Sequence, residues 1–186
     1  VHRISRVYRN TKEIQGCAQS FIEKTVSPTD SGGTHRELFP GFFDFHGPAP
    51  AFRQCTTAQK MISFIGSTIQ TLIDSAGYAL SEIAIIYTVK SRKDSEGLHL
   101  PHELEKELQS KGIMSTWVSE DYRSKRSYDV TTNNVTISTI HSVKGFDYAC
   151  VFLIGLDLLE PGERWSEEQL KSLAYVAITR ARYQLY

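Results

Sequence analysis

The feature that most constrains the fold is an uninterrupted apolar run, Ile83-Ala84-Ile85-Ile86-Tyr87. A strand with one solvated face alternates apolar and polar residues, whereas this run leaves no position for solvent. It is therefore typical of a strand inside a parallel sheet that is covered on both faces. Because parallel strands are joined by crossovers, we expect strands and helices to alternate along the chain.

The rest of the sequence meets this expectation. Apolar residues at helical spacing, with start and stop signals, predict helices from Thr11 to about Pro28, from Thr56 or Thr57 to Gly77, around Leu104 to Gly112, and over 167–179. Further strands are expected at 4–8, 51–55, 113–118, 135–140, 149–154 and 183–186. The pattern predicts an α/β fold with a mostly parallel central sheet.

We expect one domain over residues 1–186, and residues 29–50, rich in Gly, Pro and Phe, to be a long loop or insertion. The sequence stops inside a predicted strand, which suggests a fragment of a larger protein.

Composition sets limits on function. The 186 residues include 21 basic and 21 acidic side chains, so the net charge is zero, and any nucleic-acid role must rest on local sites. Cys17, Cys55 and Cys150 form no CxxC pair and the six histidines are scattered, so no metal site is expected. Without an apolar run long enough for a membrane span or a signal-peptide pattern, the expected location is the cytoplasm.

One loop between two predicted strands concentrates reactive side chains. Over 137–147 it carries hydroxyls, an imidazole, a lysine, a glycine and a carboxylate. Loops at strand ends build ligand sites in parallel α/β sheets. A solvated loop with a turn glycine explains this stretch equally well when it is taken alone.

Two arginines stand where helices meet strands. Arg180 follows the apolar face of the last predicted helix, and its planar, permanently charged fork suits phosphate. Arg9 follows Tyr8, and an aromatic beside an arginine could stack on a base and touch a phosphate. Each signal is weak alone, since a helix-terminal arginine usually complements the helix dipole.

Taken together, these stretches resemble a known family. IHSVKGFDYACVFLIGL is similar to motif V of superfamily 1 helicases, LAYVAITRAR to motif VI and YRNTKEI to motif IV, in the family's order. The chain thus resembles the second RecA-like motor domain of a DNA helicase of the UvrD/Rep type. The resemblance implies a RecA-like three-layer fold, ATP with Mg²⁺ as cofactor, and a role such as DNA repair.

The resemblance also implies roles for single residues on the nucleotide side. Arg180 and Arg9 match catalytic arginines that reach the γ-phosphate of ATP. Tyr8 matches the aromatic that stacks on adenine, and Asp147 an acidic residue, more often glutamate, that holds the ribose. Lys144 and Gly145 match positions that shape the loop between nucleotide and DNA.

On the other side of that loop, Thr139 and His141 match positions that face single-stranded DNA. The implied partners are single-stranded or partly duplex DNA and the first RecA-like domain of the same protein, but no membrane.

The sequence also departs from the family. It contains no G-x-x-x-x-G-K-[ST] phosphate loop, so the magnesium is expected in a motor domain upstream of Val1, and this fragment alone should not hydrolyse ATP. Residues 119–134 are too few for the large accessory domain of UvrD and Rep. Two alternatives stay open: a non-catalytic docking module with the same fold, and an RNA helicase of the same superfamily.

Overall fold

A computed structural model describes residues 6–7, 9–23, 41–42, 45–88, 99–118, 132–143, 145–158, 161 and 165–186. Its centre is a five-stranded sheet in the order β4-β5-β3-β6-β7, in which every neighbouring pair is parallel. The strands are β3 (Ile83–Tyr87), β4 (Ser115–Val118), β5 (Val135–Thr139), β6 (Tyr148–Ile154) and β7 (Ala181–Leu185). The predicted mostly parallel sheet is confirmed, and the apolar run that indicated it is β3, buried throughout.

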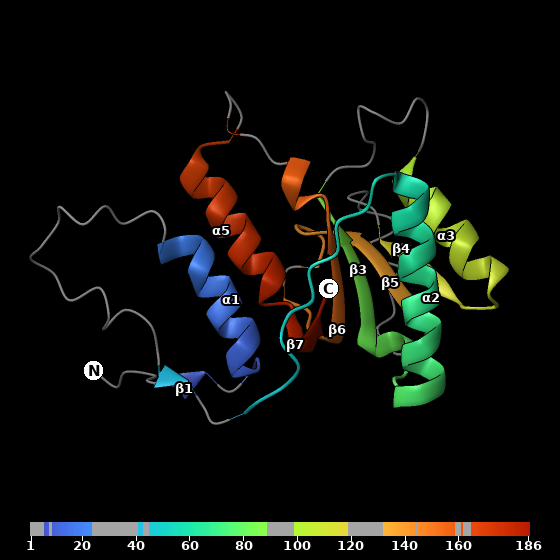
Figure 1. Cartoon of the computed structure of the whole chain (residues 1–186), viewed down its shortest axis with the longest axis horizontal. Coiled ribbons are helices and arrows are strands. Elements are labelled where there is room, and N and C mark those ends of the chain that lie inside the picture. Colours follow the sequence, from blue (N-terminus) through green and yellow to red (C-terminus); the bar gives the residue numbers. More distant parts are fainter. Residues whose placement is uncertain are drawn as a thin grey trace, which may run out of the picture.

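Helices cover both faces of this sheet, which gives three layers. Figure 1 shows α1 (Lys12–Glu23) and α5 (Glu167–Ile178) on one side, and α2 (Ala58–Ala76) and α3 (Leu100–Ser110) on the other. Short 3-10 turns, η2 (Leu80–Glu82) and η3 (Leu156–Leu158), precede β3 and follow β6. The predicted α/β, RecA-like layering is confirmed.

Local sequence sets the helix ends. The Thr57 hydroxyl accepts a hydrogen bond from the amide of Lys60 at the start of α2, and Gly77 ends that helix with a positive φ of 70°. Ser166 begins α5 through a capping box with Gln169. The described part of α1 ends at Glu23, and the predicted end near Pro28 lies outside the described residues.

The two faces of the sheet form separate cores, because alternate residues of a strand point to opposite faces. On the α2/α3 face the buried strand residues include Ile85, Ile137 and Phe152, which are neighbours in register. On the α1/α5 face, Ala84 and Ile86 pack with residues of both helices. Among the described residues, no helix is long and apolar enough to cross a membrane.

One predicted strand is wrong. Residues 51–55 join no sheet, although the amide of Ala51 donates to the carbonyl of Leu185 at 2.9 Å. The side chain of Phe52 is 94% exposed, so this segment has no apolar face to bury. It runs from the α1 side towards the start of α2 (Figure 1).

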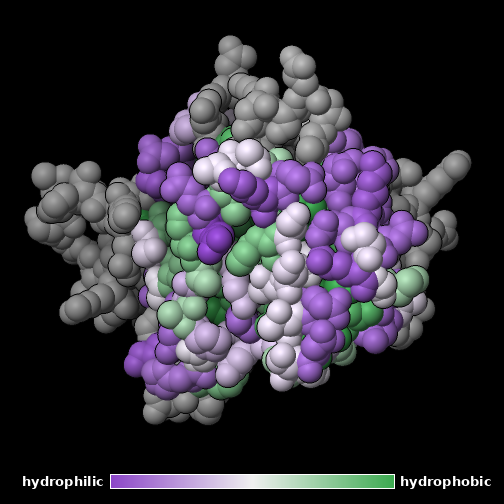
Figure 2. Space-filling view, turned by 45° about the vertical axis from the view of Figure 1, so that its right-hand side comes forward, coloured by the Kyte–Doolittle hydropathy of each residue, from purple (hydrophilic) through white to green (hydrophobic). Residues whose placement is uncertain are grey.

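A short second sheet pairs β1 (Arg6–Val7) with β2 (Gly41–Phe42) in parallel. The strand β2 lies within the predicted loop at 29–50, most of which falls outside the described residues. The face seen in Figure 2 has hydrophobic and neutral residues near its centre and hydrophilic residues mainly towards its edges.

The central strand yields a stability prediction. Ile85→Ala removes a fully buried side chain between Ile137 and Phe152 and should lower the free energy of unfolding by about 2–5 kcal/mol. Chemical denaturation followed by circular dichroism measures this loss. The control Met114→Ala changes a side chain that is 63% exposed and should shift stability by less than about 0.5 kcal/mol.

Candidate functional site

The fold brings Arg9, Asp147 and Arg180 together at the amino edge of the sheet. Asp147 directly precedes β6 and Arg180 directly precedes β7, while Arg9 lies ahead of α1. The amide of Tyr148 donates to the carbonyl of Arg180 at 3.0 Å, so the starts of the two neighbouring strands are held together. Three residues far apart in the sequence thereby form one charged cluster.

Both guanidinium groups converge on one carboxylate oxygen. Oδ1 of Asp147 forms an ion pair with Nη2 of Arg9 and lies 3.6 Å from Nη1 of Arg180. This oxygen is buried. The carboxylate therefore lies between two positively charged groups.

Arg180 is fixed by its own helix and by the loop beneath it. Its side chain is 10% exposed, and its Nε donates to the carbonyl of Val176 at 3.0 Å. Its Nη1 donates to the carbonyl of Phe146 at 3.2 Å. These bonds hold the guanidinium beside Asp147.

The two arginines are close enough to feel each other. Burial lowers the pKa of Arg180, while burial and then the positive charge of Arg180 lower the pKa of Arg9. Both groups keep their charge at neutral pH, because an arginine starts from a very high pKa. The cluster thus carries two positive charges against one negative charge.

Asn10, which the sequence did not single out, holds the two arginine-bearing segments together. It is buried, and its Nδ2 donates to the carbonyls of Thr179 at 2.9 Å and Ala181 at 2.5 Å. The capping oxygen is that of Thr11, which accepts from the amide of Ile14 at 3.4 Å. Asn10 therefore clamps the peptides on either side of Arg180 next to Arg9.

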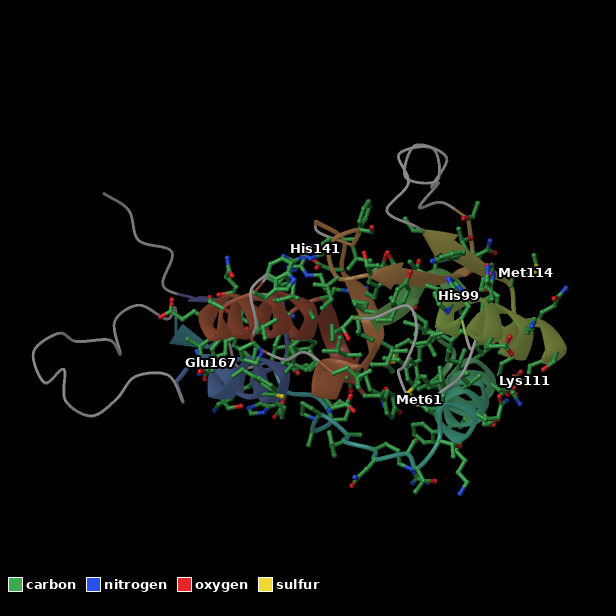
Figure 3. The ribbon with its side chains drawn as sticks, turned by 90° about the horizontal axis from the view of Figure 1, so that it is seen from above. Met61, His99, Lys111, Met114, His141 and Glu167 are labelled. Atoms are coloured by element: carbon green, nitrogen blue, oxygen red, sulfur yellow. The ribbon has the colours of Figure 1, made fainter. Side chains whose placement is uncertain are left out.

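The residues expected to face DNA lie at the opposite, carboxyl edge, where β5 ends. The hydroxyl of Thr139 contacts that of Ser142 at 3.1 Å and accepts from its amide at 3.3 Å, so it caps the turn over 140–143. His141 is exposed on that turn (Figure 3) and stacks on Trp165, with ring centroids 5.8 Å apart and planes 18° apart.

These two rings border a groove of about 430 Å³ between the turn and α5. It is lined by Ile140, His141, Trp165, Glu168, Gln169, Ser172, Leu173 and Val176. The groove has an apolar floor and polar groups that can donate and accept hydrogen bonds, and no lysine or arginine is among the described residues that line it. Sequence reasoning missed Trp165, because its partner ring lies on a distant loop.

The remaining predicted site residues divide into two groups. Gly145 has a φ of 98°, a conformation that favours glycine, where the loop turns towards Asp147. Tyr8 and Lys144 lie outside the described residues. Within the described part of the chain, no three His, Cys, Asp or Glu side chains form a group that could hold a metal ion.

Comparison with known proteins shows what part of the chain resembles. The family model described as the UvrD-like helicase C-terminal domain matches residues 118–186, which contain β5, β6, α5 and β7. This stretch is therefore similar to UvrD-like helicase C-terminal domains. The resemblance of motifs V and VI is thereby confirmed, whereas motif IV, with Tyr8 and Arg9, lies outside the matched residues.

Individual proteins are similar to longer or shorter parts of the chain. DNA helicase II of Rickettsia typhi is 26% identical over 132 residues, which are 64% of this chain and 19% of that protein. The ATP-dependent DNA helicase PcrA of Bacillus subtilis is 39% identical over 61 residues, 28% of this chain and 8% of that protein. The chain thus spans a fifth or less of the length of these relatives.

A solved structure supports the fold of almost the whole chain. The C-terminal domain of a possible DNA helicase from Lactobacillus plantarum superposes with a TM-score of 0.51 at 15% identity. The match covers 96% of this chain and 84% of that one. At this identity the likeness shows the fold alone, and it covers residues on both sides of position 118.

The clamp formed by Asn10 can be tested directly. Asn10→Ala leaves the carbonyls of Thr179 and Ala181 without their buried donor and should lower the free energy of unfolding by about 1–3 kcal/mol. Thermal and urea denaturation measure the loss. The control is Asn133→Ala, because Asn133 is exposed and accepts one hydrogen bond from the amide of Ser81. An equal loss in both variants would contradict a special role for Asn10.

Proposed function

We propose that this UvrD-like domain is the second motor domain of an ATP-dependent DNA helicase or translocase. In this proposal Arg180 and Arg9 contact the γ-phosphate of ATP, and the turn at the carboxyl edge contacts single-stranded DNA. The observation that carries the proposal is the convergence of two guanidinium groups on one anionic oxygen at the amino edge. That arrangement suits a phosphate oxygen as well as it suits a carboxylate.

The arginine pair, Arg9 and Arg180, fits the chemistry of phosphoryl transfer. This reaction depends on positioned positive charge more than on covalent chemistry by the protein, and an arginine supplied to the γ-phosphate can contribute about 10³–10⁵ in rate. Arg180 is held by two backbone carbonyls, so little reorganisation is needed to present its charge. ATP would bring its Mg²⁺, which we assign to residues of a first motor domain.

The groove at the carboxyl edge fits an uncharged aromatic ring better than a phosphate. Its rim offers the rings of His141 and Trp165 for stacking, and the groups of Gln169 and Ser172 for base edges. Bases stack on aromatic side chains with little dependence on sequence, which is what a translocase requires. Thr139 contributes by shaping the turn that carries His141.

Two segments of the same loop connect these sites. Ile140 and His141 border the groove, and residues 145–147 lead to the arginine pair. Closure of a first motor domain on the arginines would press on one end of this loop. A bound single strand of DNA would contact its other end. Such a loop can couple ATP hydrolysis to movement along DNA.

Arg180 is the first residue to test. In the full-length protein Arg180→Ala should lower DNA-stimulated ATP turnover by about 10³-fold or more, because the transition state loses a fixed positive charge. The control is Arg182→Ala, since Arg182 lies two residues later, is 48% exposed and pairs with Glu82 at 3.7 Å. Steady-state ATPase assays with and without single-stranded DNA measure both variants.

The same assay separates the alternatives. If Arg180→Ala and Arg182→Ala lose activity equally, or not at all, the motif VI assignment is wrong. A wild-type protein without ATPase activity would favour a non-catalytic docking module. Stimulation by RNA but not by DNA of the same sequence would favour an RNA helicase.

The groove yields a second prediction. Trp165→Ala should weaken binding of single-stranded oligonucleotides by about 5- to 150-fold, the range expected for the loss of one stacked base. Fluorescence anisotropy of a labelled oligonucleotide measures the affinity at fixed salt. Phe52→Ala is the control, because it removes an aromatic ring that is 94% exposed and lies outside the groove. Unchanged affinity in Trp165→Ala would exclude the groove from the DNA track.

A further inference from the structure

The carboxylate of Asp147 occupies the point at which the two guanidinium groups meet. Its Oδ1 pairs with both Arg9 and Arg180, and its side chain is 25% exposed. The resemblance described above implies a different task, the holding of a ribose. Because both arginines engage its Oδ1, the place of Asp147 in the cluster calls for an explanation beyond a contact with a sugar hydroxyl.

Electrostatics gives that explanation. Two guanidinium groups this close repel each other: burial lowers the pKa of Arg9 most, and the positive charge of Arg180 lowers it further. Without an anion between them, the exposed member of the pair, Arg9, would turn towards solvent, since its side chain is 40% exposed. Arg180 would stay in place, because two backbone carbonyls hold it. The carboxylate therefore keeps the pair converged.

We propose that Asp147 is a built-in substitute for phosphate, which holds Arg9 and Arg180 converged when no triphosphate is bound and is displaced when the γ-phosphate arrives. This inference rests on the proposed function, because it needs the arginine pair to be the phosphate site. The oxygens of the Asp147 carboxylate and of the γ-phosphate compete for the same guanidinium donors, those of Arg9 and Arg180. Asp147 then sets a threshold for binding: a ligand must replace the carboxylate with at least equal negative charge at the same point.

The length of the side chain fits this role. The peptide carbonyl next to Asp147, that of Phe146, already accepts from Arg180. A short aspartate beside that carbonyl places its oxygen between the two forks while staying close to the main chain. Displacement requires only rotation of this side chain, since the loop is fixed by the bond from the amide of Phe146 to the carbonyl of Val143 at 3.0 Å.

Two roles for Asp147 make opposite predictions. A competing anion lowers the affinity for any polyphosphate, whether or not it carries a sugar. A ribose ligand raises the affinity for ATP and has no effect on a polyphosphate without sugar. Magnesium tripolyphosphate, which has the phosphate chain of ATP and nothing else, distinguishes them.

The experiment is isothermal titration calorimetry of the full-length protein with magnesium tripolyphosphate and with ATP. Asp147→Asn keeps the shape of the side chain and removes its charge, so it should bind tripolyphosphate about three- to tenfold more tightly than wild type. Asp147→Glu restores the carboxylate and should return the affinity to within about twofold of wild type. Asp157→Asn removes the same charge from an exposed position of η3 and should leave it unchanged.

Each outcome supports or overturns the role proposed for Asp147. Unchanged or weaker tripolyphosphate binding by Asp147→Asn overturns the inference, and so does an equal gain in Asp157→Asn, which would reflect net charge alone. Tighter tripolyphosphate binding combined with weaker ATP binding supports competition and adds a ribose contact. Arg180→Ala serves as the test of the site itself: if it leaves tripolyphosphate affinity and ATP turnover unchanged, the proposed phosphate site fails whatever Asp147 does. Circular dichroism confirms that each variant is folded.

Discussion

The parallel pairing of β5, β3 and β6 is the constraint on which the rest of the structure depends. Because all three strands run in one direction and are buried on both faces, the chain must return from the carboxyl edge to the amino edge after β5. The described residues of this return are 140–143 and 145–147, and Ile140 and Val143 pack on the α1/α5 face. The loop that looks reactive in the sequence is thus a crossover with one end at each edge.

At the amino edge, buried polar groups determine how charge is arranged. Asn10 satisfies two carbonyls beside Arg180, and the backbone of Val176 and Phe146 satisfies the guanidinium. These bonds already orient the side chain of Arg180 in the folded domain. Little free energy is therefore needed to orient it when a ligand binds. A surface arginine, by contrast, loses conformational entropy when a ligand orders its side chain.

The sequence predicted most of the fold, because each strong signal was local. The run at 83–87, the cap at Thr57 and the stop at Gly77 depend on neighbours within a few residues, and the structure has all three. The strand expected at 51–55 is wrong, since pairing depends on a partner strand and not on the segment itself. Arg9 and Arg180 could be named from motifs, but their meeting at Asp147 depends on the crossover, and the stack of Trp165 on His141 depends on the packing of α5.

In the proposed function one short loop serves two ligands, and the separation of the two edges places them at opposite ends of that loop. The described residues of the loop are hydrogen-bonded near both of its ends. Thr139 and Ser142 tie the turn at the carboxyl edge, while the carbonyl of Phe146 is tied to Arg180 at the amino edge. The carbonyl of Phe146 accepts from Arg180 and its amide donates to the carbonyl of Val143, so hydrogen bonds lead from Arg180 to the turn that carries His141. Under the proposed function, coupling along this path would need no large motion within the domain, because the packed sheet beneath it resists deformation.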